Sequence, residues 1–324
     1  KFSTIAAEDQ NMSSHELLSQ IAEDYYLNKR PFGDISKKYH ISRYLVNKYL
    51  NEAVKEGIVK IEITANSHRN AQLEHILQDK YADISFYVVQ DDINNITTSE
   101  HLSNYAANLV DKLLNDNNKV IGLTWGETIY SMIDSLKSTP LERVKFTQFL
   151  GENMKYNSTA GSIRMVERAA KKVSGEFLTL PAPLYILNDI VRQGLYSEPS
   201  LQNTLAVANN MDALITGLGT LRSLESIPIW CNNLNGIFPT INFRDIAGMI
   251  YGRPYDIHGH FLNQDDDKIV GLPVNQIMKV PRRICLVRDK SKSRPVVGAL
   301  RGKLITDMIL TEAMAYRILN EENL

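Results

Sequence analysis

Cysteine is scarce in this chain, whose 324 residues include only Cys231 and Cys285. The two form no CxxC pair, so the sequence predicts neither a disulfide framework nor a zinc site, and it fits a reducing cytoplasm. Long apolar runs are missing as well. The longest stretch without charge, 226–243, is interrupted by prolines and asparagines that no bilayer-spanning helix would tolerate together. We therefore expect a soluble, cytoplasmic protein with no membrane partner.

A strong net charge is also lacking, since 36 basic and 37 acidic residues leave the chain at −1. This balance argues against a uniformly basic coat for nucleic acid. The charge is nevertheless uneven, because residues 28–60 carry eight basic and three acidic side chains, a net charge of +5. Such a segment on an otherwise acidic chain favours one small domain that meets a polyanion. A solvated helical surface is the alternative on charge alone.

The basic segment also has helical periodicity. Leu17, Ile21 and Tyr25 recur at i, i+4 and i+8, which predicts a first helix with one apolar stripe. A second short helix is expected from Pro31 or Phe32 to Tyr39, with proline suited to the first turn. After a corner at residues 40–41, a third helix should end near residue 57. Its expected N-cap is Ser42, and its expected inward residues are Val46, Leu50 and Val54.

This spacing is that of a helix-turn-helix, which presents the N-terminal residues of its second helix to the major groove. Arg43 and Asn47 are candidate base readers, because arginine can bond guanine and asparagine can bond adenine with two hydrogen bonds. Lys37 and Lys48 are better suited to phosphate. The predicted DNA-binding residues are Lys37, Ser42, Arg43, Tyr44, Asn47 and Lys48. An alternating run at 58–63 predicts a short strand or wing.

The rest of the chain has a different rhythm. A linker helix is expected within 65–80, with Leu73, Ile76 and Leu77 on one face. Beyond it, β-like runs alternate with helix-like stretches, which predicts an α/β domain with a mostly parallel sheet covered on both faces. The β-like runs are 84–89, 120–124, 144–150, 213–216 and 284–287. The helix-like stretches include 102–114, 163–173, 201–209 and 311–319.

Two strand-to-helix turns contain glycine. In 120–128 the strand runs into Gly126, and helix N-termini that follow such turns favour anions such as a sugar phosphate. Glycine is also common there for steric reasons alone, which is the competing interpretation. The segment 214–220 is a similar turn at another strand end, and open α/β sheets bind ligands at these ends.

Several motifs together resemble the SorC family of bacterial transcriptional regulators, which includes the sorbitol-type, deoxyribonucleoside and central glycolytic gene regulators. The motifs occur in the family's order from about residue 17 to the C-terminus. They are Ile41-Ser42-Arg43, 55–59, 122–128, Leu180-Pro181-Ala182-Pro183 and Leu300-Arg301-Gly302. The resemblance implies a winged helix-turn-helix at 12–64, a linker helix at 65–80 and a Rossmann-like three-layer effector domain at 81–324, similar to sugar-phosphate isomerases and deaminases. It also implies dimers or tetramers on operator DNA.

The resemblance implies an effector site as well. It assigns Gly126, Glu127 and Thr128 to a loop near the phosphate, places Gln148 in the matching strand, and assigns Arg253, Asp256 and Lys292 to the ligand's surroundings. A surface lysine is the alternative for Lys292.

This chain departs from the family pattern at several positions. Arg288 and Asp289 stand where two glycines are usual, Met249 replaces a common aspartate, and Thr311 replaces another. These changes affect the identity of the ligand more than its existence. His40 replaces a frequent glycine at the helix-turn-helix corner, which histidine tolerates because it enters the left-handed region more readily than most residues.

The function predicted from the sequence is a sequence-specific DNA-binding regulator of carbohydrate-metabolism genes, without a cofactor, whose operator affinity responds to a phosphorylated sugar or polyol. An isomerase- or deaminase-like enzyme is the alternative. Asp256, His258 and His260 could then serve as a carboxylate–histidine pair or ligate metal, although such a cluster more often marks a polar loop. A scaffold protein is a third possibility, but it would leave the basic helix-turn-helix spacing unexplained.

Overall fold

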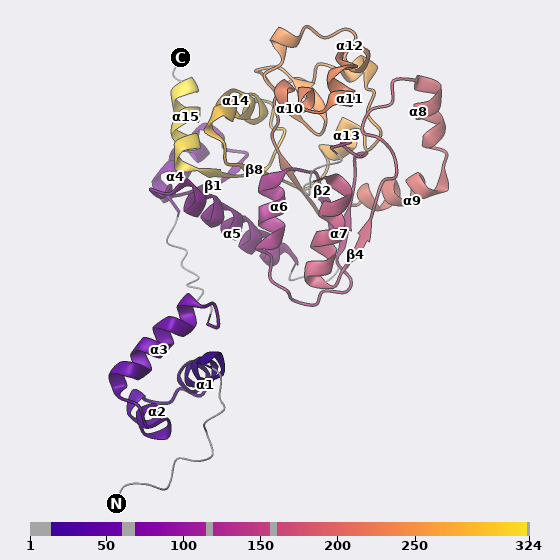
Figure 1. Cartoon of the computed structure of the whole chain (residues 1–324). Helices are drawn as coiled ribbons and strands as arrows, with labels where there is room; N and C mark the ends of the chain where they lie inside the picture. The colour runs from indigo at the N-terminus through magenta and orange to yellow at the C-terminus, as the bar shows by residue number, and fades with distance from the viewer. Residues whose placement is uncertain (1–13, 60–68, 115–118, 156–160, 323–324) are drawn as a thin grey trace, which may run out of the picture. The chain divides into compact units, whose positions relative to one another are not determined.

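The computed structural model describes residues 14–59, 69–114, 119–155 and 161–322. The chain divides into two compact units, 1–66 and 67–324 (Figure 1). No helix in the described part of the chain is long and apolar enough to cross a bilayer.

The first unit contains three helices, α1 (Ser14–Tyr26), α2 (Phe32–Lys38) and α3 (Arg43–Lys55). Their apolar stripes meet in one small core, as the periodicity predicted. The buried members of this core are Leu18, Ile21, Ala22, Ile35, Val46, Leu50 and Ala53. The prediction that Val54 points inward is wrong, because its side chain is 38% exposed. At 100° per residue Ala53 continues the stripe of Val46, whereas Val54 is turned away from it.

The corner between α2 and α3 matches the predicted helix-turn-helix. His40 has a φ of 53°, the left-handed conformation expected at this position. The Ser42 hydroxyl accepts a hydrogen bond from the Leu45 amide at 3.2 Å and so caps α3. Ile58 and Val59 pack against the core. The rest of the predicted wing, 60–63, lies outside the described residues.

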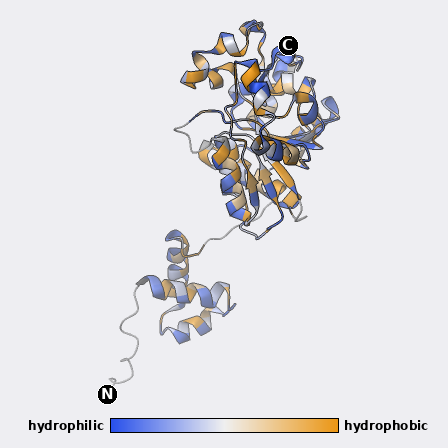
Figure 2. Ribbon diagram, turned by 90° about the vertical axis from the view of Figure 1, so that its right-hand side faces the viewer, coloured by the Kyte–Doolittle hydropathy of each residue, from blue (hydrophilic) through white to orange (hydrophobic). Residues whose placement is uncertain are grey.

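The second unit is built on a sheet of seven parallel strands in the order β1-β9-β8-β5-β2-β3-β4. The strands are β1 (Ser85–Val89), β2 (Val120–Leu123), β3 (Lys145–Thr147), β4 (Glu176–Leu178), β5 (Ala213–Gly217), β8 (Arg282–Val287) and β9 (Asp307–Thr311). Figure 2 shows mainly hydrophobic strands between helices of mixed hydropathy. A parallel sheet in an α/β unit confirms the predicted fold class.

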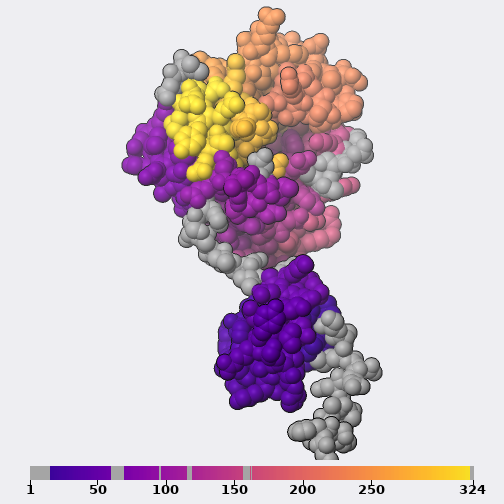
Figure 3. Space-filling model, turned by 60° about the vertical axis from the view of Figure 1, so that its left-hand side comes forward, coloured from indigo at the N-terminus to yellow at the C-terminus, as the bar shows by residue number. Residues whose placement is uncertain are grey.

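Helices cover both faces of this sheet and make three layers (Figure 1). One face carries α5 (Asn95–Leu114), α6 (Glu127–Asp134) and α7 (Ser162–Val173). The other carries α4 (Ala71–Lys80), α9 (Pro199–Ala208), α14 (Ser293–Arg301) and α15 (Glu312–Glu322). On the surface α15 lies beside the segment that contains α4 (Figure 3).

Short elements connect these layers. They are the helices α8 (Asp189–Leu195), α10 (Leu221–Glu225), α11 (Pro228–Cys231), α12 (Leu234–Ile237) and α13 (Val274–Ile277), with 3-10 turns η2 (Phe243–Asp245), η3 (Gln264–Asp266) and η4 (Lys290–Lys292). A separate antiparallel pair joins β6 (Gly248–Ile250) to β7 (Arg253–Tyr255).

The helix expected in the linker is α4, and it belongs by contact to the second unit. Leu73 and Leu77 are buried, whereas Ile76 is 49% exposed. Just before the helix, the Asn70 amide donates to the Val88 carbonyl of β1 at 2.8 Å. The helix therefore begins at the edge of the sheet.

Candidate functional site

The predicted DNA-binding residues lie on α2 and at the start of α3, and all six are exposed: Lys37, Ser42, Arg43, Tyr44, Asn47 and Lys48. Tyr44 is an aromatic side chain that is 76% exposed, although the small core lies only two residues further along the helix. The Arg43 guanidinium lies against Gly33 of α2. The N-terminal end of α3 thus exposes the cations of Arg43 and Lys48 and the side-chain amide of Asn47. The first turn of this helix carries no acidic residue.

A cavity in the second unit lies where the connections of the sheet diverge. From β2 the chain passes to α6 on one face, whereas from β5 it passes to elements packed on the other. Because β2 and β5 are neighbours, a crevice opens outside their carboxyl ends. The cavity there has a volume of about 420 Å³. Thr124 after β2 and Thr216 of β5 line it, with their hydroxyl oxygens 3.4 Å apart.

The turn at Gly126 forms one end of this cavity. Gly126 is the N-cap of α6 with a φ of 126°, a conformation that side chains rarely adopt. Glu127 and Thr128 follow in the first turn, where helix amides have no partner within the helix. No side chain caps this helix start. The end of the cavity therefore presents free backbone donors and the positive end of a helix dipole.

Lys292 closes the same end from η4. Its Nζ donates to the Leu218 carbonyl at 2.7 Å. Burial lowers the pKa of Lys292, partly offset by nearby Asp289. Beneath it the thiol of Cys285 is fully buried, which raises its pKa to about 12, so Cys285 stays neutral. Lys292 is thus a partly desolvated amine that faces the cavity, and within the described residues its hydrogen-bond acceptor is one carbonyl.

Part of the cavity lining is apolar. Trp125, Leu184, Tyr185, Met249 and Tyr251 line it. Both tyrosine hydroxyls already donate to backbone carbonyls, that of Tyr185 to Gly252 at 2.5 Å and that of Tyr251 to Leu304 at 2.9 Å, so their rings are what they offer to a ligand. The cavity therefore has a polar, cationic end and a wall of rings and aliphatic groups.

A family model described as a sugar-binding domain matches residues 66–320 of this chain. The chain belongs to this family, that of the SorC-type transcriptional regulators. It is a transcriptional regulator with a sugar-binding domain.

Relatives cover almost the whole regulator. It is 24% identical over 302 residues to the uncharacterized transcriptional regulator YjhU of Escherichia coli, over 90% of each chain. It is 21% identical to the deoxyribonucleoside regulator of Bacillus subtilis, over 94% of this chain and 98% of the relative. The crystal structure of the full-length sorbitol operon regulator SorC from Klebsiella pneumoniae has the same fold, with a TM-score of 0.75, 20% identity and coverage of 95% and 100% of the two chains.

Three predicted effector residues of the regulator do not line the cavity. Gln148 is buried and accepts a hydrogen bond from the Leu180 amide at 2.7 Å. Arg253 is 1% exposed, forms an ion pair with Asp267 and donates to the carbonyls of Tyr251 and Leu272.

Asp256 likewise lies outside the cavity and braces a turn by accepting from the amides of His258 and His260, each at 2.9 Å. The two histidines are exposed. Within the described residues no group of three or more His, Cys, Asp or Glu side chains is placed to hold a metal ion. This loop is therefore built from its own hydrogen bonds.

The structure adds lining residues that the sequence did not single out. Asn153, Lys155 and Ser223 face the cavity. No pattern in the sequence marks the first two, because the chain approaches the cavity there in an irregular loop after β3. The turn at 214–220 was noted, and its residues from Thr216 to Thr220 all line the cavity.

Proposed function

We propose that this regulator binds operator DNA through α2 and α3, and that a phosphorylated sugar or polyol in the β2/β5 cavity changes its affinity for the operator. The phosphate would meet the amides of Glu127 and Thr128 and the ammonium of Lys292. The carbon skeleton would lie along the wall of Trp125 and Met249. The observation that carries the proposal is the convergence of the Gly126 turn and Lys292 on one cavity outside the ends of β2 and β5.

The charges that line the cavity agree with an anionic ligand. The cations are Lys155, Arg288 and Lys292, against the carboxylates of Glu127 and Asp289. Backbone amides at a helix start add further positive potential. The side chain of Glu127 is exposed, so its contribution to the phosphate site would come from its amide.

Gln148, Arg253 and Asp256 would act as positioning residues in this proposal. Arg253 holds the Tyr251 carbonyl at 3.2 Å, and Tyr251 lines the cavity. Gln148 fixes the start of the 180–183 segment. Asp256 braces the turn after β7. Each would affect the ligand through the wall of the cavity.

The relatives support a carbohydrate-linked role, since one is named a deoxyribonucleoside regulator and another a sorbitol operon regulator. We also infer that the regulator acts in the cytoplasm as a dimer or tetramer. Two-fold pairing would allow two recognition helices to reach half-sites one turn apart, roughly 34–36 Å.

The experiment is a calorimetric titration of the full chain with a hexose 6-phosphate series, with the unphosphorylated hexoses beside it. Lys292→Met should lower the affinity for the phosphate ester by about 10- to 100-fold, because one charge-assisted hydrogen bond is lost. Lys279→Met is the matched control, because this exposed lysine lines neither this cavity nor the other hollow of the second unit. Equal effects of the two variants would remove Lys292 from the site, and saturation by no phosphate ester would contradict the proposal.

A further inference from the structure

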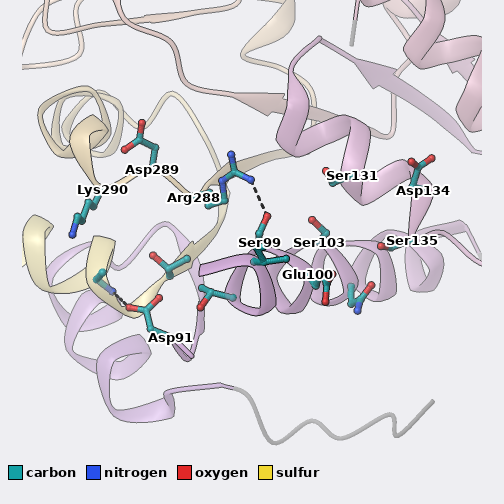
Figure 4. A pocket seen from close by; sticks show the side chains of 15 residues that line it. Asp91, Ser99, Glu100, Ser103, Ser131, Asp134, Ser135, Arg288, Asp289 and Lys290 are labelled. Carbon is teal, nitrogen blue, oxygen red and sulfur yellow. Dashed lines mark hydrogen bonds between the residues drawn. The ribbon is translucent and has the colours of Figure 1, made fainter. Parts of the chain in front are cut away.

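A second hollow lies at the same edge of the sheet, outside the carboxyl ends of β1 and β9 (Figure 4). Its volume is about 1060 Å³. The connection after β1 leads to α5 on one face, whereas β9 leads directly into α15 on the other. Since β1 and β9 are neighbours, their connections diverge as those of β2 and β5 do. The sheet thus has a second point at which a crevice is expected, and the hollow lies there.

Arg288 separates this hollow from the cavity described above. It follows β8, lines both spaces, and donates from Nη1 to the Ser99 hydroxyl of α5 at 2.8 Å. Figure 4 shows the side chain spanning from β8 to α5. Asp289 also lines both spaces, so the two are neighbouring compartments that meet at Arg288 and Asp289.

Hydroxyl groups are as frequent as charged groups along the second hollow. Its serine and threonine side chains are Thr98, Ser99, Ser103, Ser131, Ser135 and Thr311. Ser103 is only 4% exposed and lines the hollow from the middle of α5. Its hydroxyl makes no hydrogen bond within the described residues, and Figure 4 shows it directed from α5 toward α6. A buried hydroxyl normally finds a hydrogen-bond partner, so a ligand or ordered water is expected here.

The charges differ in sign from those of the first cavity. Two cations, Arg288 and Lys290, face four carboxylates, which belong to Asp91, Glu100, Asp134 and Asp289. Asp134 is neutralised by an ion pair with Arg168. The remaining excess of negative charge disfavours a phosphate dianion, whereas hydroxyl and carboxylate oxygens suit the hydroxyls of a neutral sugar.

We propose that the β1/β9 hollow is a second ligand site of this regulator, and that it takes a neutral, unphosphorylated sugar or polyol. The Ser103 hydroxyl and the carboxylate of Asp91 would bond its hydroxyls, and Lys290 would close the rim. The hollow is large enough for one or two sugar units. The site is independent of the proposed phosphate site, because Arg288 stands between them.

The test uses saturation-transfer NMR on the full chain with glucose, maltose and sorbitol as probes. Ser103→Leu places a larger apolar group in the hollow and should lower the affinity for the probe at least tenfold. Ser131→Leu does the same from α6 on the opposite wall, should one variant fail to fold. Ser138→Leu is the matched control, since this exposed serine lines neither space. Thermal melting verifies that each variant is folded.

Lys292→Met distinguishes the two sites. It should leave probe binding unchanged, because Lys292 lines only the first cavity. Three results would overturn the proposal: no probe binds at millimolar concentration, binding persists in both leucine variants, or Lys292→Met abolishes it. The last result would place the neutral sugar in the first cavity, even if phosphate esters bind there as proposed.

Discussion

The side chain of Asn70 performs two tasks, because its oxygen caps α4 and its nitrogen holds Glu312 at the start of α15. The cap is a bond from the Leu73 amide at 3.0 Å, and the bond to Glu312 measures 2.6 Å. Glu312 also accepts from the Asp91 amide at 3.1 Å, and Asp91 accepts from the Ala313 amide at 2.7 Å. This chain of bonds links the residues that follow segment 60–68 to the β1/β9 hollow.

We predict that Asn70→Ala lowers the free energy of unfolding of the second unit by about 1 kcal/mol or slightly more, the usual value of an N-cap plus the bond to Glu312. Asn188→Ala is the matched control. Asn188 caps α8 with a bond from the Val191 amide at 3.1 Å and makes no hydrogen bond to a carboxylate within the described residues. Urea unfolding measures both, and a smaller loss for Asn70→Ala than for Asn188→Ala would contradict the double role.

A variant of Glu312, the residue that Asn70 holds, tests communication between the units. Residues 69–70 are the first described positions after the segment that leads from the DNA-binding unit. If the effector acts through this route, the change in operator affinity that a phosphate ester causes should shrink in Glu312→Gln, from a coupling of typically ~1–3 kcal/mol. Fluorescence anisotropy with a selected operator duplex measures the coupling. An unchanged coupling in a variant that still binds both partners would exclude Glu312 from the route.

The predicted base contact of Arg43 has its own test. Arg43→Ala should reduce discrimination between the operator and a scrambled duplex by about 1–3 kcal/mol, because a bidentate base contact is lost. Lys48→Ala should lower the affinity for both duplexes similarly. It should also reduce the slope of log affinity against log salt concentration by about one. Binding titrations at several salt concentrations separate the two effects. If Arg43→Ala weakened both duplexes equally, Arg43 would be a phosphate contact.

Proton linkage should accompany effector binding at Lys292. Burial lowers the pKa of its ammonium, whereas a bound phosphate favours the charged form, so affinity should fall as the pH rises through the lowered pKa. On the acid side affinity should fall below a pH of about 6, where the phosphate itself takes up a proton. Calorimetry in buffers of different ionisation enthalpy measures the proton uptake. Lys292→Met should abolish the alkaline limb and retain the acid one.

Local patterns in the sequence predicted much of the fold. The N-cap Ser42, the corner at His40 and the three amphipathic stripes follow from interactions within a few residues, and all are found. β9 was not singled out, because Asp307–Thr311 has only three apolar residues in a row and continues directly into α15 without a turn. Strand order was beyond prediction as well, since it depends on contacts between segments far apart in the chain.

The candidate site shows the same division. The Gly126 turn could be found because its spacing is local, and Lys292 through the resemblance. Arg253 could not be placed from the sequence. Its guanidinium is buried and pairs with Asp267 and two carbonyls, and these contacts depend on the folded interior. The role of Arg288 as a partition also depends on a contact with Ser99, 189 positions away.

The buried carboxylate of Asp24 should control the stability of the first unit. Burial raises its pKa, but hydrogen bonds from Lys38 at 2.7 Å, Tyr39 at 2.9 Å and Asn28 outweigh burial, so the pKa lies below its usual range. A carboxylate with a lowered folded-state pKa stabilises the fold above its unfolded pKa. This stabilisation is lost as the pH falls through the folded value.

Asp24→Asn should therefore destabilise α1 and α2 near neutral pH by about 1 kcal/mol, a modest value because Lys38 is partly exposed and its charge is screened. The difference from the parent chain should vanish in acid, where Asp24 is protonated in both states. Hydrogen exchange of the α1 and α2 amides in the full chain measures it. Asp34→Asn, at an exposed carboxylate in the first turn of α2, is the control. A loss in Asp24→Asn that persisted unchanged into acid would show that shape, and not the charge of Asp24, stabilises the unit.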